Sequence, residues 1–404
     1  MDVFTSISAG AAHATRCIDM HTSGAPARII ISGIPHLEGA TLLEKQATFA
    51  RDHGSIRRQA MQEPRGHSGM FGCALIADTE LTRLPISSGG AHMGVLYMHH
   101  DDFYSFCGHV TFALARFLVD TADLDVFPQR KDLAFDTKTL ETKLRLHTPS
   151  GVVEVTVPVL AGGEKCDSSR TISFLSTPSY TIQKSLWLEI PPSCLWHELN
   201  GAKGISISIA FGGAVYGIVP VQHLGFRRGF HDMTLTQLTA IYTTISSLLN
   251  GETNEPIICP VTSTRVKIAG LLITDESKGS SSGSVLEGET GINIYGNGAI
   301  DRGPCGAGSA ARVALAVSTA SRHVGQKWAY NSPISAQHQG QGAFVATPQS
   351  IVMIGPGEKV KAVVVKIEAK AWYTAATTFT AERKDTIAAS GLDFGGIIDR
   401  FLAG

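Results

Sequence analysis

Two segments of the chain, 198 residues apart, share one arrangement of residues. In each segment a Cys-Gly pair stands directly before a run of small and apolar side chains: Cys107 precedes His109 to Asp120, and Cys305 precedes Gly306 to Thr319. Each run is apolar on nearly every face, which is typical of a buried helix. Because the chain has 404 residues, the spacing is close to half its length. An internal duplication would produce this spacing, with each half wrapping strands around its own buried helix.

β-Branched runs dominate the rest of the chain. Four runs bounded by glycine or proline predict strands, and several of them alternate with period two. Two longer segments have apolar residues at three- and four-residue steps, which predicts amphipathic helices. The predicted strands are Arg28–Ser32, Gly151–Val157, Ile205–Ala210 and Val360–Ile367, and the predicted helices are Thr41–Ala60 and Leu235–Leu249. The length exceeds what one hydrophobic core usually serves, so two strand-rich domains are expected.

One stretch has low complexity. Residues Glu276 to Glu289 are rich in serine and glycine, which favours a mobile surface loop. An insertion without function is the preferred interpretation, and an active-site lid is the alternative.

Charge and composition exclude several classes of protein. With 34 basic and 35 acidic residues, the chain has no electrostatic footprint for nucleic acid or for an anionic membrane. The N-terminal segment is polar and acidic where a signal peptide would be basic, and no stretch approaches the roughly 20 apolar residues that span a bilayer. The seven cysteines include no CxxC pair, so free thiols are expected rather than a disulfide scaffold. A cytoplasmic location is therefore expected.

The two Cys-Gly-helix segments carry the chemistry. A cysteine at a helix N-terminus lies beside free backbone N–H groups and the positive end of the helix dipole, which stabilise its thiolate. The same N–H groups can bind a carboxylate. If Cys107 and Cys305 flank one ligand, one thiolate can remove an α-proton while the opposite thiol delivers a proton to the other face. This predicts a stereo-inverting proton exchange on an amino acid, and the reaction requires no cofactor.

A nicotinamide-binding site is an alternative interpretation of the second segment. Gly306, Gly308 and Ala311 match part of a dinucleotide-binding fingerprint. Such a site would require an acidic residue roughly 20 positions later. None occurs between Ser309 and Gly357, so the fingerprint is rejected.

Metal and hydrolase sites are also disfavoured. His99, His100, Asp101 and Asp102 offer metal-ligating groups, but neighbouring residues of a strand point to opposite faces and cannot easily share an ion. A loop would relax that limit, and a loop without a metal is the preferred interpretation. Cys107 and His109 could suggest a cysteine hydrolase. A pair two residues apart at a helix start is not expected to face, which argues against that reading.

The chain resembles the proline racemase family, which includes proline racemases, 4-hydroxyproline epimerases and trans-3-hydroxyproline dehydratases. The similarity runs along the whole length, and the two cysteine motifs carry most of it. The stretches that look like family motifs are Asp19–Arg28, Glu63–Met70, Phe106–His109, Ala210–Gly213 and Asp301–Gly306.

The resemblance implies the fold. It is an α/β (α+β) architecture of two pseudo-symmetric halves, each a curved sheet or barrel around a central helix, similar to diaminopimelate epimerase. The active site is expected in the cleft between the halves. The first half is expected to contain residues 1–146 and 376–404, and the second residues 147–375.

The resemblance also implies the roles of individual residues. Cys107 and Cys305 correspond to the two acid/base residues. The backbone amides of the residues that follow them correspond to a carboxylate site, two side chains lie near the ring nitrogen, and one aromatic residue forms a pocket wall. These binding residues are Gly108, His109, Gly306 and Ala307 for the carboxylate, His109 and Asp301 for the nitrogen, and Tyr295 for the wall. Neither a metal nor a cofactor is implied.

Within the family, the dehydratases have a threonine at the second cysteine position, because loss of water after removal of the α-proton needs no second proton donor. Cys305 therefore favours racemisation or epimerisation of proline or a hydroxyproline. Other segments look closer to the dehydratase branch, so a trans-3-hydroxy-L-proline dehydratase that uses Cys107 as its base is the first alternative. A non-catalytic ligand-binding protein of the same fold is the second. The expected partner is a small amino or imino acid, and a homodimer is the default on general frequency alone.

Overall fold

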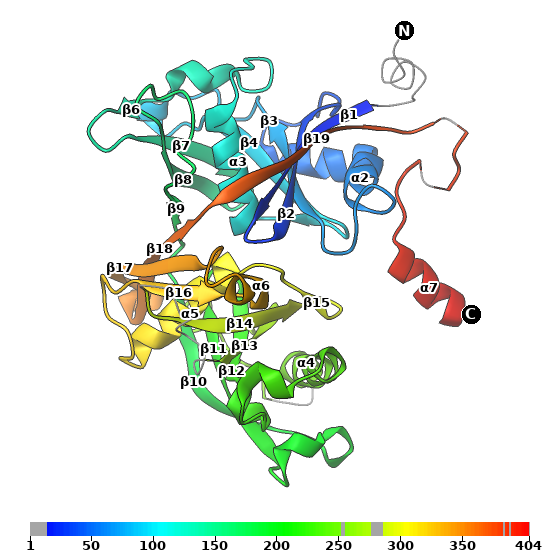
Figure 1. The fold of residues 1–404 in the computed structure, drawn as a ribbon, viewed down its shortest axis with the longest axis vertical. Helices are drawn as coiled ribbons and strands as arrows, with labels where there is room; N and C mark the ends of the chain where they lie inside the picture. The colour runs from blue at the N-terminus through cyan, green and yellow to red at the C-terminus, as the bar shows by residue number, and fades with distance from the viewer. Residues whose placement is uncertain (1–13, 252–254, 276–285, 383, 388, 404) are drawn as a thin grey trace. The chain divides into compact units, whose positions relative to one another are not determined.

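The computed structural model describes residues 14–251, 255–275, 286–382, 384–387 and 389–403 (Figure 1). The chain divides into two compact units: unit 1 contains Met1–Ser173 and Lys370–Gly404, and unit 2 contains Phe174–Ala369. Residues 276–285 of the serine-rich segment lie outside the described residues, and its last two residues, Gly288 and Glu289, begin strand β14.

The unit boundaries fall at other residues than the sequence suggested, 173/174 and 369/370 rather than 146/147 and 375/376. The hairpin of β7 (Glu141–Thr148) and β8 (Gly151–Pro158) belongs to unit 1 because β7 pairs in parallel with β4 (Met93–His99). At the second boundary, β19 (Ala371–Thr380) pairs from end to end with β1 (Ala14–Thr22). Both differences arise from pairing between residues far apart in the sequence.

Unit 1 is built on a sheet whose strands run in the order β19, β1, β2, β3, β4, β7 and β8. Short strands β5 and β6 extend it at β4 and β7. The elements not yet given bounds are β2 (Ala25–Ser32), β3 (Phe71–Ile76), β5 (Phe103–Tyr104), β6 (Phe135–Asp136), α2 (Leu42–Met61), α3 (Gly108–Asp120) and α7 (Phe394–Ala403).

Unit 2 has a sheet in the order β10, β11, β12, β13, β14, β16, β17 and β18. Its elements are β10 (Tyr180–Glu189), β11 (Gly204–Phe211), β12 (Val215–Pro220), β13 (Gly270–Asp275), β14 (Gly288–Tyr295), β15 (Ala299–Ile300), β16 (Trp328–Asn331), β17 (Phe344–Ile354), β18 (Val360–Ala369), α4 (Leu235–Asn250), α5 (Gly306–Ser318) and α6 (Pro333–Gln337), and β9 (Ile172–Leu175) lies at the boundary with unit 1. The predicted strands and helices named above all form.

The two units repeat one topology. From β19 to β8, successive pairings in unit 1 are antiparallel, antiparallel, parallel, antiparallel, parallel and antiparallel. From β10 to β17, unit 2 has the same series. Helix α2 follows β2 as α4 follows β12, and α3 follows β5 as α5 follows β15. The predicted duplication is therefore present in the order and direction of the strands.

Each sheet is covered by helices of two kinds. The apolar stripe of α2, which includes Leu42, Phe49 and Ile56, packs on Ile30 of β2 and other strand residues. The helix begins at a capping box in which the Thr41 hydroxyl accepts from the backbone of Glu44. The neighbour Ile29 is also fully buried, since successive strand residues face opposite sides. On that other side lies α3, which contacts β1 and β2.

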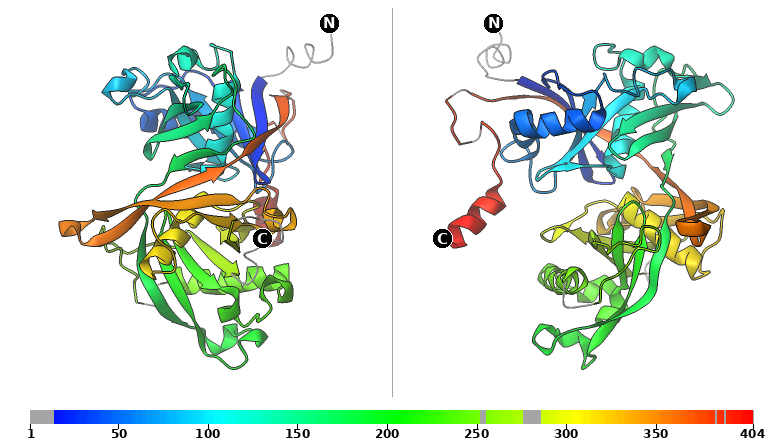
Figure 2. Two further views of the ribbon diagram at one scale, coloured as in Figure 1. Left: turned by 60° about the vertical axis from the view of Figure 1, so that its left-hand side comes forward. Right: turned by 180° about the vertical axis from the view of Figure 1, so that it is seen from behind.

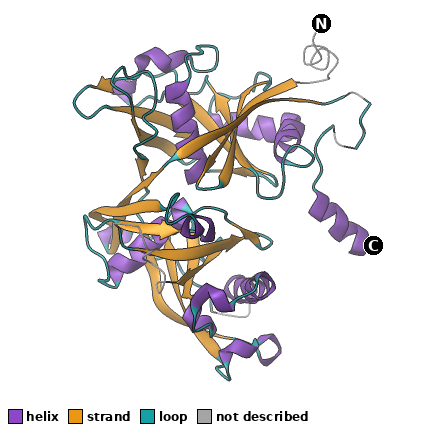
Figure 3. Cartoon of the chain, in the orientation of Figure 1, coloured by secondary structure: helices purple, strands orange, loops and turns teal. Residues whose placement is uncertain are grey.

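Helices α3 and α5 are the central helices of their units. Helix α3 contacts β1, β2, β3, β8 and β19, and α5 contacts β10, β11, β12, β17 and β18. Most of their residues are buried, as the all-round apolar sequences predicted. Figure 3 distinguishes the helices from the strands by colour, and Figure 2 shows the chain from two other sides. Among the described residues, no helix has both the length and the apolar character to cross a membrane.

Candidate active site

Each candidate thiol is the residue that precedes a central helix. Cys107 has an extended backbone (φ −142°, ψ 109°) directly before α3, and Cys305 (φ −73°, ψ 123°) holds the same place before α5. Neither cysteine is in a disulfide, and both residues are partly exposed. The first N–H groups of a helix have no partner within it. The amides of Gly108 and His109 in α3, and of Gly306 and Ala307 in α5, are among these N–H groups.

In unit 1 the thiol contacts a histidine of its own helix. Cys107 Sγ lies 3.5 Å from His109 Nδ1, so the expectation that this pair does not face is wrong. Because Cys107 has an extended backbone, its side chain is not fixed by helical geometry. Burial lowers the pKa of His109 to about 4, opposed by a hydrogen bond to the backbone of Pro26. His109 is therefore neutral near pH 7 and can exchange a hydrogen bond, but not an ion pair, with the thiol.

In unit 2 the thiol has donors and a carboxylate around it. Cys305 Sγ accepts from the backbone N–H of Gly308 at 3.3 Å and lies 3.4 Å from the hydroxyl of Tyr216. Burial raises the pKa of Cys305 to about 12; the charge of Asp301 adds to the rise, and the hydrogen bonds from Tyr216 and Gly308 oppose it. This thiol is therefore held protonated near pH 7.

Asp301 is itself positioned by a strand residue. Asn293 Nδ2 donates to Asp301 Oδ2 at 2.7 Å, and the backbone N–H of Asp301 donates to the Asn293 carbonyl at 3.0 Å. Tyr295, half-buried at the end of β14, lies on the same face of the strand as Asn293, since strand side chains alternate. The structure thus brings together Asp301 and Cys305, and places Tyr295 on the strand face that holds Asp301.

Sequence reasoning did not identify Tyr216 or Asn293. Tyr216 follows by three residues the glycine turn Ala210–Gly213, and it approaches Cys305 across 89 positions of sequence. Asn293 lies between Ile292 and Ile294 in β14, and like Glu289 and Thr290 of the same strand it is buried. A polar residue between two isoleucines was the available signal for Asn293.

The segment after β4 forms a hydrogen-bonded cluster. His99 Nδ1 lies 2.8 Å from Asp101 Oδ1, and His100 Nδ1 lies 3.0 Å from His99 Nδ1. Strand geometry does not separate these residues, because β4 ends at His99 and the chain turns there. Their ligand atoms lie within 4.8 Å of one another. However, the carboxylate and both imidazoles are engaged with one another, and the Arg57 guanidinium donates to the carbonyls of His99 and His100. A nearby guanidinium makes the cluster less favourable for a cation.

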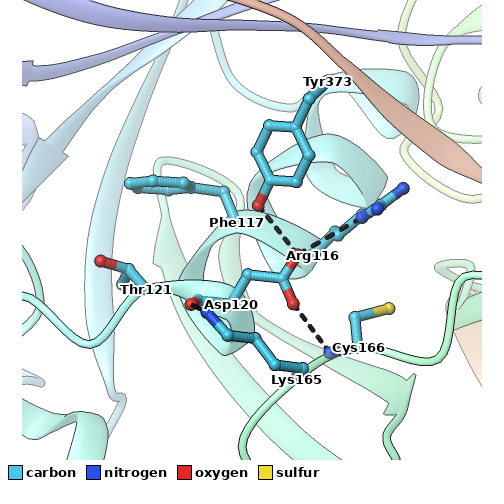
Figure 4. A pocket seen from close by; sticks show the side chains of 7 residues that line it. All are labelled: Arg116, Phe117, Asp120, Thr121, Lys165, Cys166 and Tyr373. Carbon is cyan, nitrogen blue, oxygen red and sulfur yellow. Dashed lines mark hydrogen bonds and ion pairs between the residues drawn. The ribbon is translucent and has the colours of Figure 1, made fainter.

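A cavity of about 390 Å³ lies at the C-terminal end of α3 (Figure 4). Its central group is Asp120, which accepts hydrogen bonds from the Tyr373 hydroxyl at 2.9 Å and the Cys166 backbone at 2.7 Å and pairs with Arg116. Arg116 also donates to the Ala371 carbonyl. The network joins α3, β19 and the segment around residue 166, so its role is to hold unit 1 together.

Comparisons with known proteins agree with the topology. The sequence model of the family described as "Proline racemase" matches residues 17–391. The trans-L-3-hydroxyproline dehydratase of Pongo abelii and the trans-3-hydroxy-L-proline dehydratase of Homo sapiens are each 27% identical over 374 residues, which is 92% of either chain. Proline racemase A of Trypanosoma cruzi is 29% identical over 325 residues, 80% of this chain and 68% of that protein.

Solved structures share the fold. A hydroxyproline epimerase from Agrobacterium vitis, with bound trans-4-OH-L-proline, has a TM-score of 0.69 at 17% identity and covers 95% of both chains. A probable proline racemase from Agrobacterium radiobacter, with bound carbonate, has a TM-score of 0.70 at 18% identity, covering 95% of this chain and 97% of that one. The predicted fold class is therefore confirmed.

Proposed function

This chain belongs to the proline racemase family, and we propose that it is a cofactor-independent racemase or epimerase that inverts the α-carbon of proline or a hydroxyproline. Relatives with similar sequences include both a proline racemase and dehydratases of 3-hydroxyproline. The choice between an isomerase and a hydro-lyase is therefore part of the proposal.

The observation that carries the proposal is that both units place a thiol at the same point of a repeated topology. Cys107 precedes α3 and Cys305 precedes α5. A dehydration needs one base for the α-proton, whereas inversion needs a second group that returns a proton to the opposite face. Cys305 supplies that second group, and the proton held on it by burial and Asp301 suits it to act as the acid.

In the proposed reaction, the thiolate of Cys107 forms an S–H bond with the α-proton as the Cα–H bond breaks. The electron pair passes into the carboxylate, which gains negative charge. The N–H groups at the two helix starts would stabilise this charge, because preorganised donors act most strongly where charge develops. The Cys305 S–H bond then breaks and its proton joins the opposite face of Cα, which leaves a Cys305 thiolate and a Cys107 thiol. The opposite handedness of substrate uses the two thiols in reverse.

Asp301 would bind the secondary ammonium group of the substrate. An ammonium group beside Asp301 would offset the negative charge that raises the pKa of Cys305. The substrate would thereby make the Cys305 thiolate accessible for the reverse direction. His109, neutral near pH 7, would lie beside the ring nitrogen without repelling its charge.

Exchange in deuterated water tests the function. L-Proline, trans-4-hydroxy-L-proline and trans-3-hydroxy-L-proline are incubated separately with the protein, and the α-proton is followed by NMR. Gain of deuterium with inversion is the expected result. Replacement of Cys107 or Cys305 by serine should abolish inversion, whereas Cys194→Ser, which changes the exposed cysteine, should leave it intact.

The alternatives give different spectra. Loss of water from the 3-hydroxy substrate without inversion would identify a dehydratase, the activity named for the relatives at 27% identity. No change in any substrate would favour a ligand-binding protein and refute the proposal. Inversion that persists in Cys305→Ser would refute the two-thiol mechanism.

A further inference from the structure

We propose that Tyr216 is a positioning residue for Cys305: its phenol O–H donates a hydrogen bond to Sγ and holds the thiolate when it forms. The proposal rests on the proposed function, in which Cys305 is an acid/base group. The hydroxyl lies 3.4 Å from Sγ, a normal separation for a hydrogen bond to sulfur. Tyr216 is only 6% exposed, so water does not compete freely for the contact.

The surrounding residues fix the phenol ring. Tyr216 packs with Ala210, Ile218, Leu272 and Ala311, and Cys305 lies against the same cluster. The strand partner of Tyr216 on β13 is Gly270. A Cβ at this position would lie 3.3 Å from the Tyr216 ring and 2.9 Å from Asn293 Oδ1. The absence of a side chain at Gly270 therefore leaves the space that the phenol and the Asn293 amide occupy.

The repeated topology shows that this contact belongs to one half only. Tyr216 pairs with Ala210 at the second rung from the turn between β11 and β12, and Pro26 pairs with His21 at the second rung between β1 and β2. Proline at the corresponding position has no hydroxyl. Conversely, α3 has His109 as its second residue where α5 has Ala307.

Each thiol thus has one polar aromatic partner, supplied from a different element. Cys107 has the imidazole of its own helix at 3.5 Å, and Cys305 has the phenol of a strand at 3.4 Å. His109 is neutral near pH 7, so neither partner brings a positive charge. The phenol of Tyr216 can donate to a Cys305 thiolate, which favours the charged form. The single N–H of a neutral His109 is engaged by the Pro26 backbone, so its other nitrogen can accept from the Cys107 thiol.

The other groups around Cys305 oppose the thiolate. Asp301 and burial favour the neutral thiol, while Tyr216 and the Gly308 N–H favour the thiolate. The nearest ion pair along the helix, Arg312 with Glu289 at 2.6 Å, lies two turns beyond Cys305. Tyr216 is therefore the side chain that offsets Asp301, and its removal should leave the thiol harder to ionise.

Alkylation of Cys305 tests this without any substrate. The full chain is treated with iodoacetamide between pH 7 and 9, and the labelling rate of each cysteine is read from its peptide by mass spectrometry. Tyr216→Phe should slow labelling of Cys305 about 3- to 10-fold, since a lost hydrogen bond to a charged acceptor reduces the thiolate population while each remaining thiolate becomes more nucleophilic. Labelling of Cys107 should not change.

Tyr242→Phe is the matched control. Tyr242 is 5% exposed, and its hydroxyl donates to the Gly296 carbonyl at 2.8 Å within the same unit. The substitution also removes one buried phenol hydrogen bond, but it leaves Cys305 untouched, so labelling of Cys305 should keep the wild-type rate. Incorporation of 3-fluorotyrosine at position 216 gives a more acidic donor and should speed labelling, even if Tyr216→Phe does not fold.

The outcomes separate the two proposals. Equal Cys305 labelling in wild type and Tyr216→Phe, or equal slowing in Tyr242→Phe, would overturn the role of Tyr216. Slower labelling in Tyr216→Phe alone supports it. A wild-type protein that exchanges no α-proton but shows this slowing would refute the proposed function and still support the assignment of Tyr216 to the thiol. In an active enzyme, Tyr216→Phe should lower kcat more than it changes KM, because the contact is to the thiol rather than to the substrate.

Discussion

Asp301 should control the proton on Cys305, and replacement by asparagine tests that relation. Asp301→Asn removes one negative charge and keeps the size of the side chain. The contact with Asn293, now 2.7 Å from Nδ2 to Oδ2, can persist through the amide oxygen. Burial and the Tyr216 and Gly308 contacts of Cys305 remain in the variant. The change in the thiol therefore reports the carboxylate charge and its hydrogen bond.

The magnitude follows from the groups around the thiol. The pKa of Cys305 stands at about 12, with burial as the largest cause and the Asp301 charge as the second. A neighbouring like charge shifts a pKa by about one to three units. Because burial persists, we expect Asp301→Asn to lower the pKa by about one to two units. The thiolate population near pH 8 then rises about 10- to 100-fold. Each thiolate is less nucleophilic, so alkylation should accelerate about 3- to 10-fold.

The assay is peptide-resolved alkylation at several pH values, as for Tyr216. Asp301→Asn should speed labelling of Cys305, whereas Asp232→Asn, which changes an acid of unit 2 paired with the exposed Arg228, should not. Asp301→Asn should also lose inversion activity, because the substrate ammonium group loses its proposed partner. Unchanged or slower labelling of Cys305 would refute the electrostatic argument, whatever the effect on activity.

Three further predictions concern stability. Burial raises the pKa of Cys17 to about 12, so the folded protein holds the neutral thiol. The contribution of this thiol to the free energy of unfolding is complete below about pH 9 and decreases toward pH 12, by up to about 1.4 kcal/mol per pH unit. Urea unfolding at pH 8, 9 and 10 should therefore show a smaller pH dependence in Cys17→Ala than in the wild type. Asp120→Ala removes the carboxylate that pairs with Arg116 and accepts from the Tyr373 hydroxyl, so it should lower the free energy of unfolding by about 3 kcal/mol. Asp232→Ala, at the exposed Arg228, should lower it by less than about 1 kcal/mol. Equal urea midpoints for the two variants would contradict this. Gly270→Ala should lower the free energy of unfolding by about 1–3 kcal/mol, because the added Cβ would crowd Asn293 Oδ1 and the Ile294 carbonyl. A urea midpoint equal to that of the wild type would show that the space beside Gly270 is not needed.

Local patterns predicted the position of the thiols because helix starts are local structures. The apolar runs after Cys107 and Cys305 defined both helices, and the central helices followed from burial on every face. The spacing of the two motifs predicted the duplication, which the order of strand pairings confirms. The shared family motifs then favoured proton transfer on a proline derivative, which stays a prediction.

The partners of the thiols were not local, and they could not be predicted in the same way. Tyr216 reaches Cys305 from 89 positions away, and its contact depends on the register of β12 against β13. The predictions that His109 would not face Cys107, and that strand geometry would separate His99 from its neighbours, failed for a different reason. Periodicity rules hold inside a helix or a strand, whereas Cys107 precedes its helix and His100 follows its strand. Functional side chains at such ends are placed by the turn, which period-based reasoning does not describe.

The duplication also explains why the two thiols need not be equivalent. Two thiols in equivalent surroundings would have equal pKa values, and neither would be favoured as the holder of the proton. In this chain Asp301 and Tyr216 surround Cys305, whereas His109 contacts Cys107. Because a group with a raised pKa retains its proton, the resting enzyme would have Cys305 as the acid. A substrate that brings an ammonium group to Asp301 reduces that preference, so ionisation of the second thiol would depend on the ligand whose carbon it must reach.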